Sequence, residues 1–279
     1  MSSMQVKQPP PAYAGGSDWI TKVAFLLTLL VAVSLFLVVP ATSAAADKRK
    51  AQRSSRSKPS RGLTRVELKE AEARLSEMGY GTGRVDGVID ETSRLSVIAF
   101  QKWEGRDITG RLSRDDYQAI MNAEPPRARE QNYRHAEVDL DRQVLLLTDD
   151  DGNVKRVLPV SSGSNRQYKE KRAKGLAYTP RGRFRIHAKI SGWRESPLGL
   201  LYYPSYFSGG VAIHGNPSVP TTPESHGCVR VPMSAAVEVS RQLPVGTIVL
   251  IYDQRSFVSA KDWAEADRVA DGNRKPGQQ

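Results

Sequence analysis

The sequence predicts an α+β multidomain protein, with a small three-helix domain followed by a mostly β domain. Its 279 residues suffice for about two domains of ordinary size. Apolar residues recur at helical spacing between residues 63 and 122, which predicts short helices around a small core. Between residues 133 and 252, short apolar runs are separated by turn residues, a pattern typical of a β sandwich or barrel.

Composition and charge limit the possible functions. The chain has 41 Lys and Arg against 30 Asp and Glu, a net charge of +11. Residues 47–62 contain seven basic residues and one acidic residue, so this segment alone contributes +6. The remainder is close to balance, which argues against nucleic acid as a partner. Cys228 is the only cysteine, and this excludes an internal disulfide framework and a multi-cysteine metal site.

Residues 1–46 have the organisation of an export signal. An almost wholly apolar, uncharged run covers residues 23–39, Lys22 precedes it, and small residues with an Ala-x-Ala pattern at 44–46 follow it. This predicts a signal peptide or an uncleaved signal anchor, and therefore an extracytoplasmic location in the periplasm or cell wall. The basic residues that follow oppose this orientation, because positive charge normally stays on the cytoplasmic side.

Three segments are predicted to connect or follow the folded domains. Residues 47–62 form a basic linker, either a solvated tether or a segment that adheres to an anionic envelope polymer or membrane surface. Residues 123–132, with Pro125 and Pro126, form a second linker. Residues 253–279 form a polar C-terminal tail.

Each helix of the first domain, residues 63–122, has its own signal. The second helix is predicted over Glu91 to Trp103, and the third begins at Ser113, whose hydroxyl forms a capping box with Asp116. The first helix carries an apolar stripe spaced by 3, 4 and 3 residues, formed by Leu68, Ala71, Leu75 and Met78.

The strands of the second domain, residues 133–252, follow from alternation and turn residues. Residues 135–163 predict two strands joined by a turn at 149–153. Residues 183–190 alternate apolar and polar side chains, which predicts one half-buried strand with His187 pointing outward. His135 lies at the domain edge and is assigned no role. Three further elements are a strand at 211–213 that delivers His214, a helix after Ser234 and a closing strand at 247–252.

The residues that carry chemistry lie near the end of the second domain. Cys228 belongs to the run Ser225-His226-Gly227-Cys228-Val229-Arg230, and His214 precedes it by 14 residues. An imidazole that accepts the thiol proton gives an ion pair with a nucleophilic thiolate. Gly227 permits close backbone approach, and the N–H groups of Gly227 and Cys228 are candidate donors to an oxyanion. On a strand, Arg230 shares a face with Cys228 and suits a substrate carboxylate.

Two other interpretations use the same residues. His214, His226 and Cys228 are also a possible set of zinc ligands. Alternatively, the run is a structural turn without chemistry. The residue types alone leave these alternatives open.

Several motifs of the first domain stand at ordered spacing: Met78-Gly79-Tyr80, Val85-Asp86-Gly87, Thr92, Ala99-Phe100-Gln101 and Thr109-Gly110. This pattern resembles the peptidoglycan-binding domain type 1 family. The resemblance implies docking on cell-wall glycan. The alternative is that these residues hold turns and core and bind nothing.

The pair His214-Gly215, followed by the run from Ser225 to Arg230, resembles the catalytic motif of the L,D-transpeptidase (YkuD) family. The resemblance extends to 160–163, 179–184 and Gly246-Thr247, and covers about residues 133–252. It implies a YkuD-like sandwich as the catalytic domain. Many members carry Asn at the position of Arg230, which leaves the role of this arginine open.

The resemblance implies a role for each residue of the motif. Cys228 is the nucleophile and His214 is its general base, oriented by the backbone carbonyl of Gly215. The backbone N–H groups of His226, Gly227 and Cys228 form the oxyanion hole. The substrate-binding candidates are Ser225, Arg230, Tyr202 and Tyr206, with aromatic core as the alternative for the two tyrosines.

The implied activity is that of a cysteine acyltransferase. It cross-links peptidoglycan stem peptides (3→3) through an acyl-enzyme on Cys228, releases D-Ala, and needs no metal or organic cofactor. Peptidoglycan is therefore the expected partner. The alternatives are an L,D-carboxypeptidase, attachment of a protein amine to the wall by the same acyl-enzyme, or a non-catalytic wall-binding protein.

Overall fold

The computed structural model describes residues 62–171 and 173–254. The predicted export signal, nearly all of the basic linker and most of the polar tail lie outside these residues. Within the described ranges, none of the helices is both long enough and apolar enough to cross a membrane.

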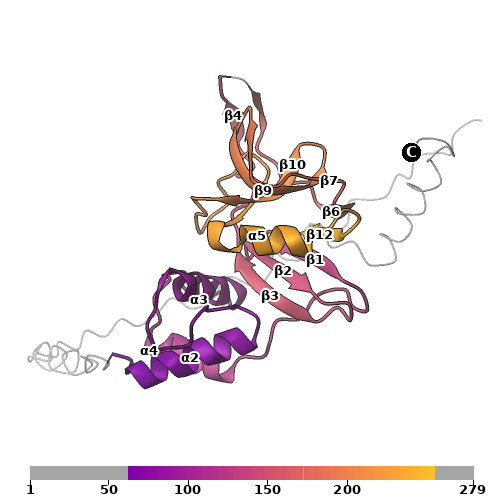
Figure 1. The fold of residues 1–279 in the computed structure, drawn as a ribbon. Coiled ribbons are helices and arrows are strands. Elements are labelled where there is room, and N and C mark those ends of the chain that lie inside the picture. The colour runs from indigo at the N-terminus through magenta and orange to yellow at the C-terminus, as the bar shows by residue number, and fades with distance from the viewer. Residues whose placement is uncertain (1–61, 172, 255–279) are drawn as a thin grey trace, which may run out of the picture. The chain divides into compact units, whose positions relative to one another are not determined.

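Three helices, α2 to α4, form the first folded segment (Figure 1). The predicted bounds of the second helix and the predicted capping box of the third are confirmed. The first helix has its own capping box, because the hydroxyl of Thr64 accepts the N–H of Glu67 while the Glu67 carboxylate accepts the N–H of Thr64. The helices are α2 (Arg65–Glu77), α3 (Glu91–Trp103) and α4 (Arg114–Asn122).

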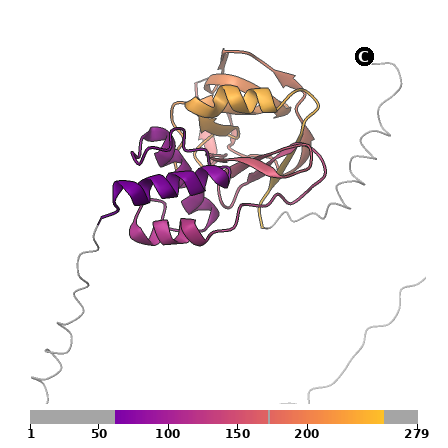
Figure 2. The ribbon, with the colours of Figure 1, turned by 60° about the horizontal axis from the view of Figure 1, so that its bottom comes forward.

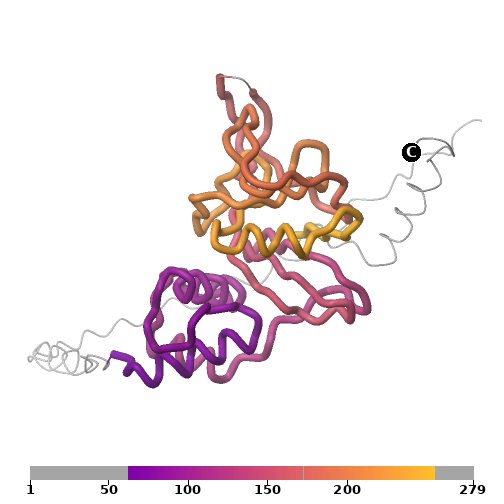
Figure 3. Tube along the Cα trace, in the orientation of Figure 1, coloured from indigo at the N-terminus to yellow at the C-terminus, as the bar shows by residue number. Residues whose placement is uncertain are grey.

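Two five-stranded sheets follow, and they confirm the predicted mostly β architecture. The first sheet contains, in spatial order, β3 (Val154–Pro159), β2 (Val144–Thr148), β1 (His135–Asp139), β12 (Ile248–Tyr252) and β6 (Gly182–Arg185). The second contains β11 (Val229–Pro232), β10 (Val211–Asn216), β9 (Gly199–Ser208) and β7 (Ala188–Lys189), with β8 (Trp193–Ser196) also paired to β9. A separate hairpin is formed by β4 (Gln167–Lys169) and β5 (Lys174–Leu176), at the top of Figure 3.

Residues 135–163 contain three strands, so the prediction of two strands is wrong. The chain reverses between β1 and β2, where the carboxylate of Asp139 accepts the backbone N–H groups of Asp141 and Arg142. Gln143 completes this reversal with a φ of 55°. The apolar residues on both sides hide the reversal in the sequence, because β1 and β2 are buried along their whole length.

The prediction of one strand over residues 183–190 is also wrong, although His187 is exposed as expected. The segment is divided between the two sheets: β6 pairs with β12 in the first sheet, and β7 pairs with β9 in the second. Ile186 is buried at the crossing point. Alternation therefore continues through the segment even though its hydrogen-bonding partners change.

The main core lies between the sheets and includes the helix α5 (Met233–Gln242), which begins two residues earlier than predicted. A second core joins the three helices to the first sheet, where Phe100 of α3 clusters with Leu146 and Val157. Figure 2 shows the ribbon of the helices and the sheets from a second side. Because the helices bury their apolar face against β2 and β3, they share a core with the β domain.

Glu137 and His135 form a buried polar cluster that the sequence does not reveal. Both side chains are fully buried, and the imidazole Nε2 of His135 lies 2.9 Å from the Glu137 carboxylate. The same carboxylate accepts the Tyr252 hydroxyl at 3.0 Å and the backbone N–H of Arg129 at 2.8 Å. The cluster thus fastens the segment between the helices and β1 onto the first sheet.

Candidate active site

The register of two parallel strands sets the geometry of the site. In β10 and β11, Ile213 pairs with Val229 and His214 pairs with Arg230. Paired residues of parallel strands point to the same face of the sheet, so His214 and Arg230 share a face. Cys228 lies two residues before Arg230, and alternation brings its side chain to this face as well.

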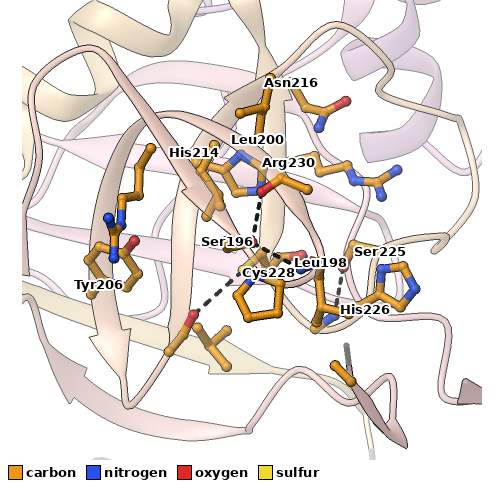
Figure 4. A pocket seen from close by; sticks show the side chains of 18 of the residues that line it. Ser196, Leu198, Leu200, Tyr206, His214, Asn216, Ser225, His226, Cys228 and Arg230 are labelled. Carbon is orange, nitrogen blue, oxygen red and sulfur yellow. Dashed lines mark hydrogen bonds between the residues drawn. The ribbon is translucent and has the colours of Figure 1, made fainter. Parts of the chain in front are cut away.

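A cleft of about 550 Å³ opens over this face (Figure 4). The hairpin of β4 and β5 contributes Tyr168 and Leu176, and the hairpin of β8 and β9 contributes residues 194–201. Most of the predicted site residues line it together, namely Cys228, His214, His226, Gly227, Ser225, Arg230 and Tyr206.

A backbone carbonyl holds the His214 ring in one orientation. The His214 side chain is buried, and its Nδ1 lies 2.9 Å from the backbone carbonyl of Gly215, as predicted. A carbonyl oxygen only accepts hydrogen bonds, so Nδ1 carries the proton and Nε2 has a free lone pair. Burial lowers the pKa of His214 to about 4, with a smaller contribution from the positive charge of Arg230, while the Gly215 carbonyl opposes this change.

Cys228 is held as a thiol. Burial raises the pKa of Cys228, and the backbone N–H of Ala212, 3.4 Å from Sγ, and the charge of Arg230 oppose this increase only in part. With a weakly basic imidazole and a weakly acidic thiol, the neutral pair is favoured. Desolvation of both groups thus acts against the ion pair predicted from the sequence.

Alkylation of Cys228 tests this resting state. We expect the rate constant for reaction with iodoacetamide to rise about tenfold per pH unit between about pH 6 and pH 8, because a thiol of raised pKa reacts through its small thiolate fraction. Stopped-flow or mass-spectrometric kinetics give this profile directly, since Cys228 is the only cysteine. A rate constant independent of pH across this range would show a thiolate–imidazolium pair instead.

Ser225 organises from within the loop of residues 225–228, here called the catalytic loop. Its side chain is buried, its Oγ accepts the backbone N–H of Gly227 at 3.0 Å, and its hydroxyl donates to the carbonyl of Cys228. The hydroxyl is therefore used inside the loop. The N–H of Gly227 also donates its hydrogen bond within the loop. This N–H is therefore not directed at an oxyanion, in contrast to the oxyanion hole that the resemblance implies. The backbone N–H groups of His226 and Cys228 have no hydrogen-bond partner among the described residues.

Gly227 is required by the path of the loop. Its φ is 138°, and a Cβ at this position would lie 2.8 Å from the carbonyl oxygen of Tyr178. The neighbouring Thr179, buried at 1% exposure, donates its hydroxyl to the carbonyl of Gly227 at 2.7 Å. These contacts hold the loop against residues 178–179.

His226 connects the catalytic loop to the β4–β5 hairpin. Its ring meets the ring of Tyr168 edge-on at 4.7 Å between centroids, and its Nε2 lies 3.6 Å from the Glu170 carboxylate. Among residues 62–171 and 173–254, no three His, Cys, Asp or Glu side chains are grouped so that they could hold a metal ion. The ligand set of the zinc alternative is thus not assembled here.

Tyr202 is not part of the cleft, so its predicted contact with substrate is not supported. It packs against the main core and lies opposite Gly215 on the neighbouring strand. A Cβ added at Gly215 would be 3.2 Å from the Tyr202 ring. The ring of Tyr203 meets it edge-on, and the ring of Trp193 lies against it at a tilt. The aromatic-core alternative describes Tyr202, whereas Tyr206, four residues along β9, does line the cleft.

Gly215 allows β10 to lie close to α5. A Cβ added at this position would come within 2.5 Å of the Cβ of Ala236, which has no flexible atoms that can move away. We expect Gly215→Ala to lower the free energy of unfolding by about 1–3 kcal/mol, the usual cost of overpacking, as measured by urea denaturation. Gly210→Ala is the matched control, because a Cβ there meets open space. Equal stability of the two variants would contradict this packing argument.

The structure adds residues to the site that the sequence analysis missed. Arg194, Leu198, Leu200 and Asn216 line the cleft, and Thr179 supports the loop. Exposed leucines in a hairpin have no local signal of function. The sign that the sequence offers is their position next to Gly199, a residue type that favours turns. In the structure Gly199 has a φ of 119°.

Comparisons with known proteins agree with this geometry. Residues 133–251 match the family model described as "L,D-transpeptidase catalytic domain", and residues 64–120 match the model described as "Putative peptidoglycan binding domain". The search of curated proteins gives no match.

Solved structures provide the closer comparison. The L,D-transpeptidase from Xylanimonas cellulosilytica is 37% identical, covers 70% of this chain and 97% of its own, and has a TM-score of 0.64. The L,D-transpeptidase from Stackebrandtia nassauensis is 23% identical, covering 66% of this chain and 90% of its own with a TM-score of 0.39. The identity and coverage of the first of these, together with the match of the catalytic domain, show that this chain belongs to the L,D-transpeptidase family.

Proposed function

We propose that this peptidoglycan transpeptidase forms 3→3 cross-links through an acyl-enzyme on Cys228, with release of D-Ala. The observation that carries the proposal is the single face on which His214, Cys228 and Arg230 meet, in a cleft with two hairpins as walls. His214 is fixed there with Nδ1 protonated, which leaves Nε2 to accept a proton.

The first half-reaction is acylation. Sγ of Cys228 attacks the carbonyl carbon of the third stem residue while Nε2 of His214 takes the thiol proton. The backbone N–H groups of His226 and Cys228 are the candidate donors to the resulting oxyanion, each worth about 3–4 kcal/mol where such donors have been measured. The tetrahedral intermediate collapses to a thioester, and D-Ala leaves as an amine that takes the proton from His214.

The second half-reaction reverses these roles. The side-chain amine of a neighbouring stem attacks the thioester carbonyl, and His214 receives the amine proton. Collapse breaks the C–S bond, forms the amide cross-link, and returns the proton to Sγ. No oxidation or net proton uptake occurs. A buried imidazole with a pKa of about 4 is neutral at physiological pH, so the base is ready in every molecule.

Arg230 is the proposed partner of a substrate carboxylate. It pairs with His214 in the register, lines the cleft, and is only partly buried. A guanidinium can hold a carboxylate with two parallel hydrogen bonds, which suits the terminal carboxylate of a stem peptide. The same charge lowers the pKa values of His214 and Cys228, so it also contributes to the electrostatics of the pair.

Product analysis tests the proposal. The purified full chain is incubated with a disaccharide-tetrapeptide, and the products are identified by mass spectrometry, with a chelator and with Cys228→Ser as parallel arms. We expect a chelator-insensitive 3→3 dimer and free D-Ala, both absent with the variant. Tripeptide without dimer would assign an L,D-carboxypeptidase instead, and loss of product with the chelator would indicate a metal-dependent hydrolase.

We also propose that the chain acts outside the cytoplasm, where peptidoglycan lies. The support comes from the apolar run at 23–39 and the small residues after it, which lie outside the described residues. The basic linker, residues 47–62, is proposed to contact an anionic polymer or membrane surface because of its charge of +6. Fractionation of cells that produce the full chain tests the location, and recovery in the cytoplasmic fraction alone would contradict it.

A further inference from the structure

Lys102 is a buried lysine that the proposed mechanism does not use. It belongs to α3 and is only 3% exposed. Its Nζ donates to the backbone carbonyl of Val160 at 2.8 Å and to that of Gln143 at 3.3 Å. Lysines this deeply buried are rare without a partner, and in the part of the chain that the structure describes no carboxylate pairs with Nζ. The polar partners of Lys102 Nζ are therefore these two backbone carbonyls.

Protonation does not break these contacts. Burial lowers the pKa of Lys102 to about 7, so both forms are populated at neutral pH. The ammonium and the neutral amine both carry N–H groups. The hydrogen bonds from α3 to the two carbonyls accordingly persist in either form.

Gln143 lies between Lys102 and the segment of residues 160–164, here called the support segment. Its carbonyl accepts the backbone N–H of Val160 at 3.0 Å, beside the bond from Lys102. Its side-chain oxygen accepts the N–H of Ser162 at 2.8 Å, and its side-chain nitrogen donates to the Ser162 hydroxyl at 2.8 Å. Residues 160–162 of the support segment are thus fixed by Lys102 and Gln143 together.

The support segment holds both sides of the catalytic loop. On the C-terminal side of Cys228, Ser161 and Arg230 exchange backbone hydrogen bonds of 3.2 and 3.0 Å. On the N-terminal side of Cys228, the N–H of Ser225 donates to the carbonyl of Ser162 at 2.9 Å, and the N–H of Ser164 donates to the carbonyl of Ser225 at 3.0 Å. Cys228 lies between these two attachments, so a shift of the support segment moves the nucleophile.

We propose that Lys102 is a positioning residue of the active site, through which the helical domain holds the support segment and, with it, the loop that carries Cys228. The helices thereby act as part of the catalytic unit in addition to any docking on glycan. The inference deepens the proposed function, because its catalytic readout rests on acylation of Cys228. Its structural readout is independent of any substrate.

The test compares Lys102→Met with Lys69→Met in the full chain. Methionine keeps most of the aliphatic stem of Lys102 and removes the donor, while Lys69 is an exposed lysine of α2 in the same domain. The exchange leaves the Val160 carbonyl without the Lys102 donor, which destabilises the fold, and it also removes the desolvation penalty of a buried lysine, which stabilises it. The two effects oppose each other. We therefore expect the thermal unfolding midpoint of both variants to stay within a few degrees of the original chain.

Three readouts separate positioning from folding. With Lys102→Met we expect faster amide hydrogen exchange at Ser164 and Ser225, an altered alkylation rate of Cys228, and a fall of about tenfold or more in kcat for acylation with little change in KM. Lys69→Met should change none of these. Lys102→Arg, which restores a donor, should recover part of kcat.

The outcomes are distinguishable. Unchanged exchange at Ser164 and Ser225 with Lys102→Met would overturn the proposal, as would a loss of kcat that only follows a lowered unfolding midpoint. If the original chain shows no transpeptidation, the proposed function fails, while hydrogen exchange and Cys228 alkylation still decide whether Lys102 positions the loop.

Discussion

Replacing Cys228 by serine is expected to lower kcat/KM for D-Ala release by at least about 10³-fold, the scale seen when a catalytic nucleophile is removed. A serine hydroxyl is far less acidic than a thiol, and His214 is a weak base with a pKa of about 4, so it cannot deprotonate the hydroxyl effectively. Release of D-Ala from a tetrapeptide donor, followed by mass spectrometry, measures the effect.

The stability of the same variant provides the control. The Cys228 thiol accepts the Ala212 N–H at 3.4 Å and donates to the Gly210 carbonyl at 3.9 Å. A serine hydroxyl can also accept and donate, so serine should leave the thermal unfolding midpoint nearly unchanged. Activity retained within tenfold by a folded Cys228→Ser variant would assign the nucleophile to another group.

Substitution of His214 by glutamine is expected to cost about 10²–10⁴-fold in kcat, the usual contribution of a general base. The loss should shrink as the pH rises. In the original chain the imidazole is already neutral above about pH 5, because its pKa is about 4, so the base adds no pH dependence there. The variant must rely on the thiolate fraction of Cys228, which increases about tenfold per pH unit while the pH is below the raised thiol pKa.

A pH series of kcat for both proteins, between about pH 6 and pH 9, measures this convergence. Glutamine keeps a side-chain amide near the Gly215 carbonyl, which limits disturbance of β10. A ratio of the two kcat values that stays constant across the series would mean that His214 has a structural role and does not transfer the proton.

Much of the site could be predicted because its signals are local. The capping box of α4 lies at the start of the helix that it caps, and the run from Ser225 to Arg230 contains its candidate chemistry within six residues. The pairing of His214 with Gly215 involves adjacent residues. Such short-range features are visible in the sequence without knowledge of the fold.

The missed features depend on contacts between distant residues. In the sequence, Lys102 has the appearance of an ordinary helical lysine, and only the fold places the Val160 carbonyl next to its Nζ. Tyr202 and Tyr206 both lie on β9, but a register irregularity against β10 and the packing of α5 determine which of them faces the cleft. Desolvation also decides the state of Cys228 and His214, and burial is a property of the folded chain.

Intact-protein mass spectrometry of the acyl-enzyme tests the central claim most directly. The full chain is mixed rapidly with a tetrapeptide donor in the absence of acceptor, quenched in acid, and digested to locate the adduct. The account predicts a mass increase equal to the donor minus D-Ala, carried by the peptide that contains Cys228 and absent from Cys228→Ser. Release of D-Ala with the adduct on any other residue, or with an equal adduct on Cys228→Ser, would contradict it.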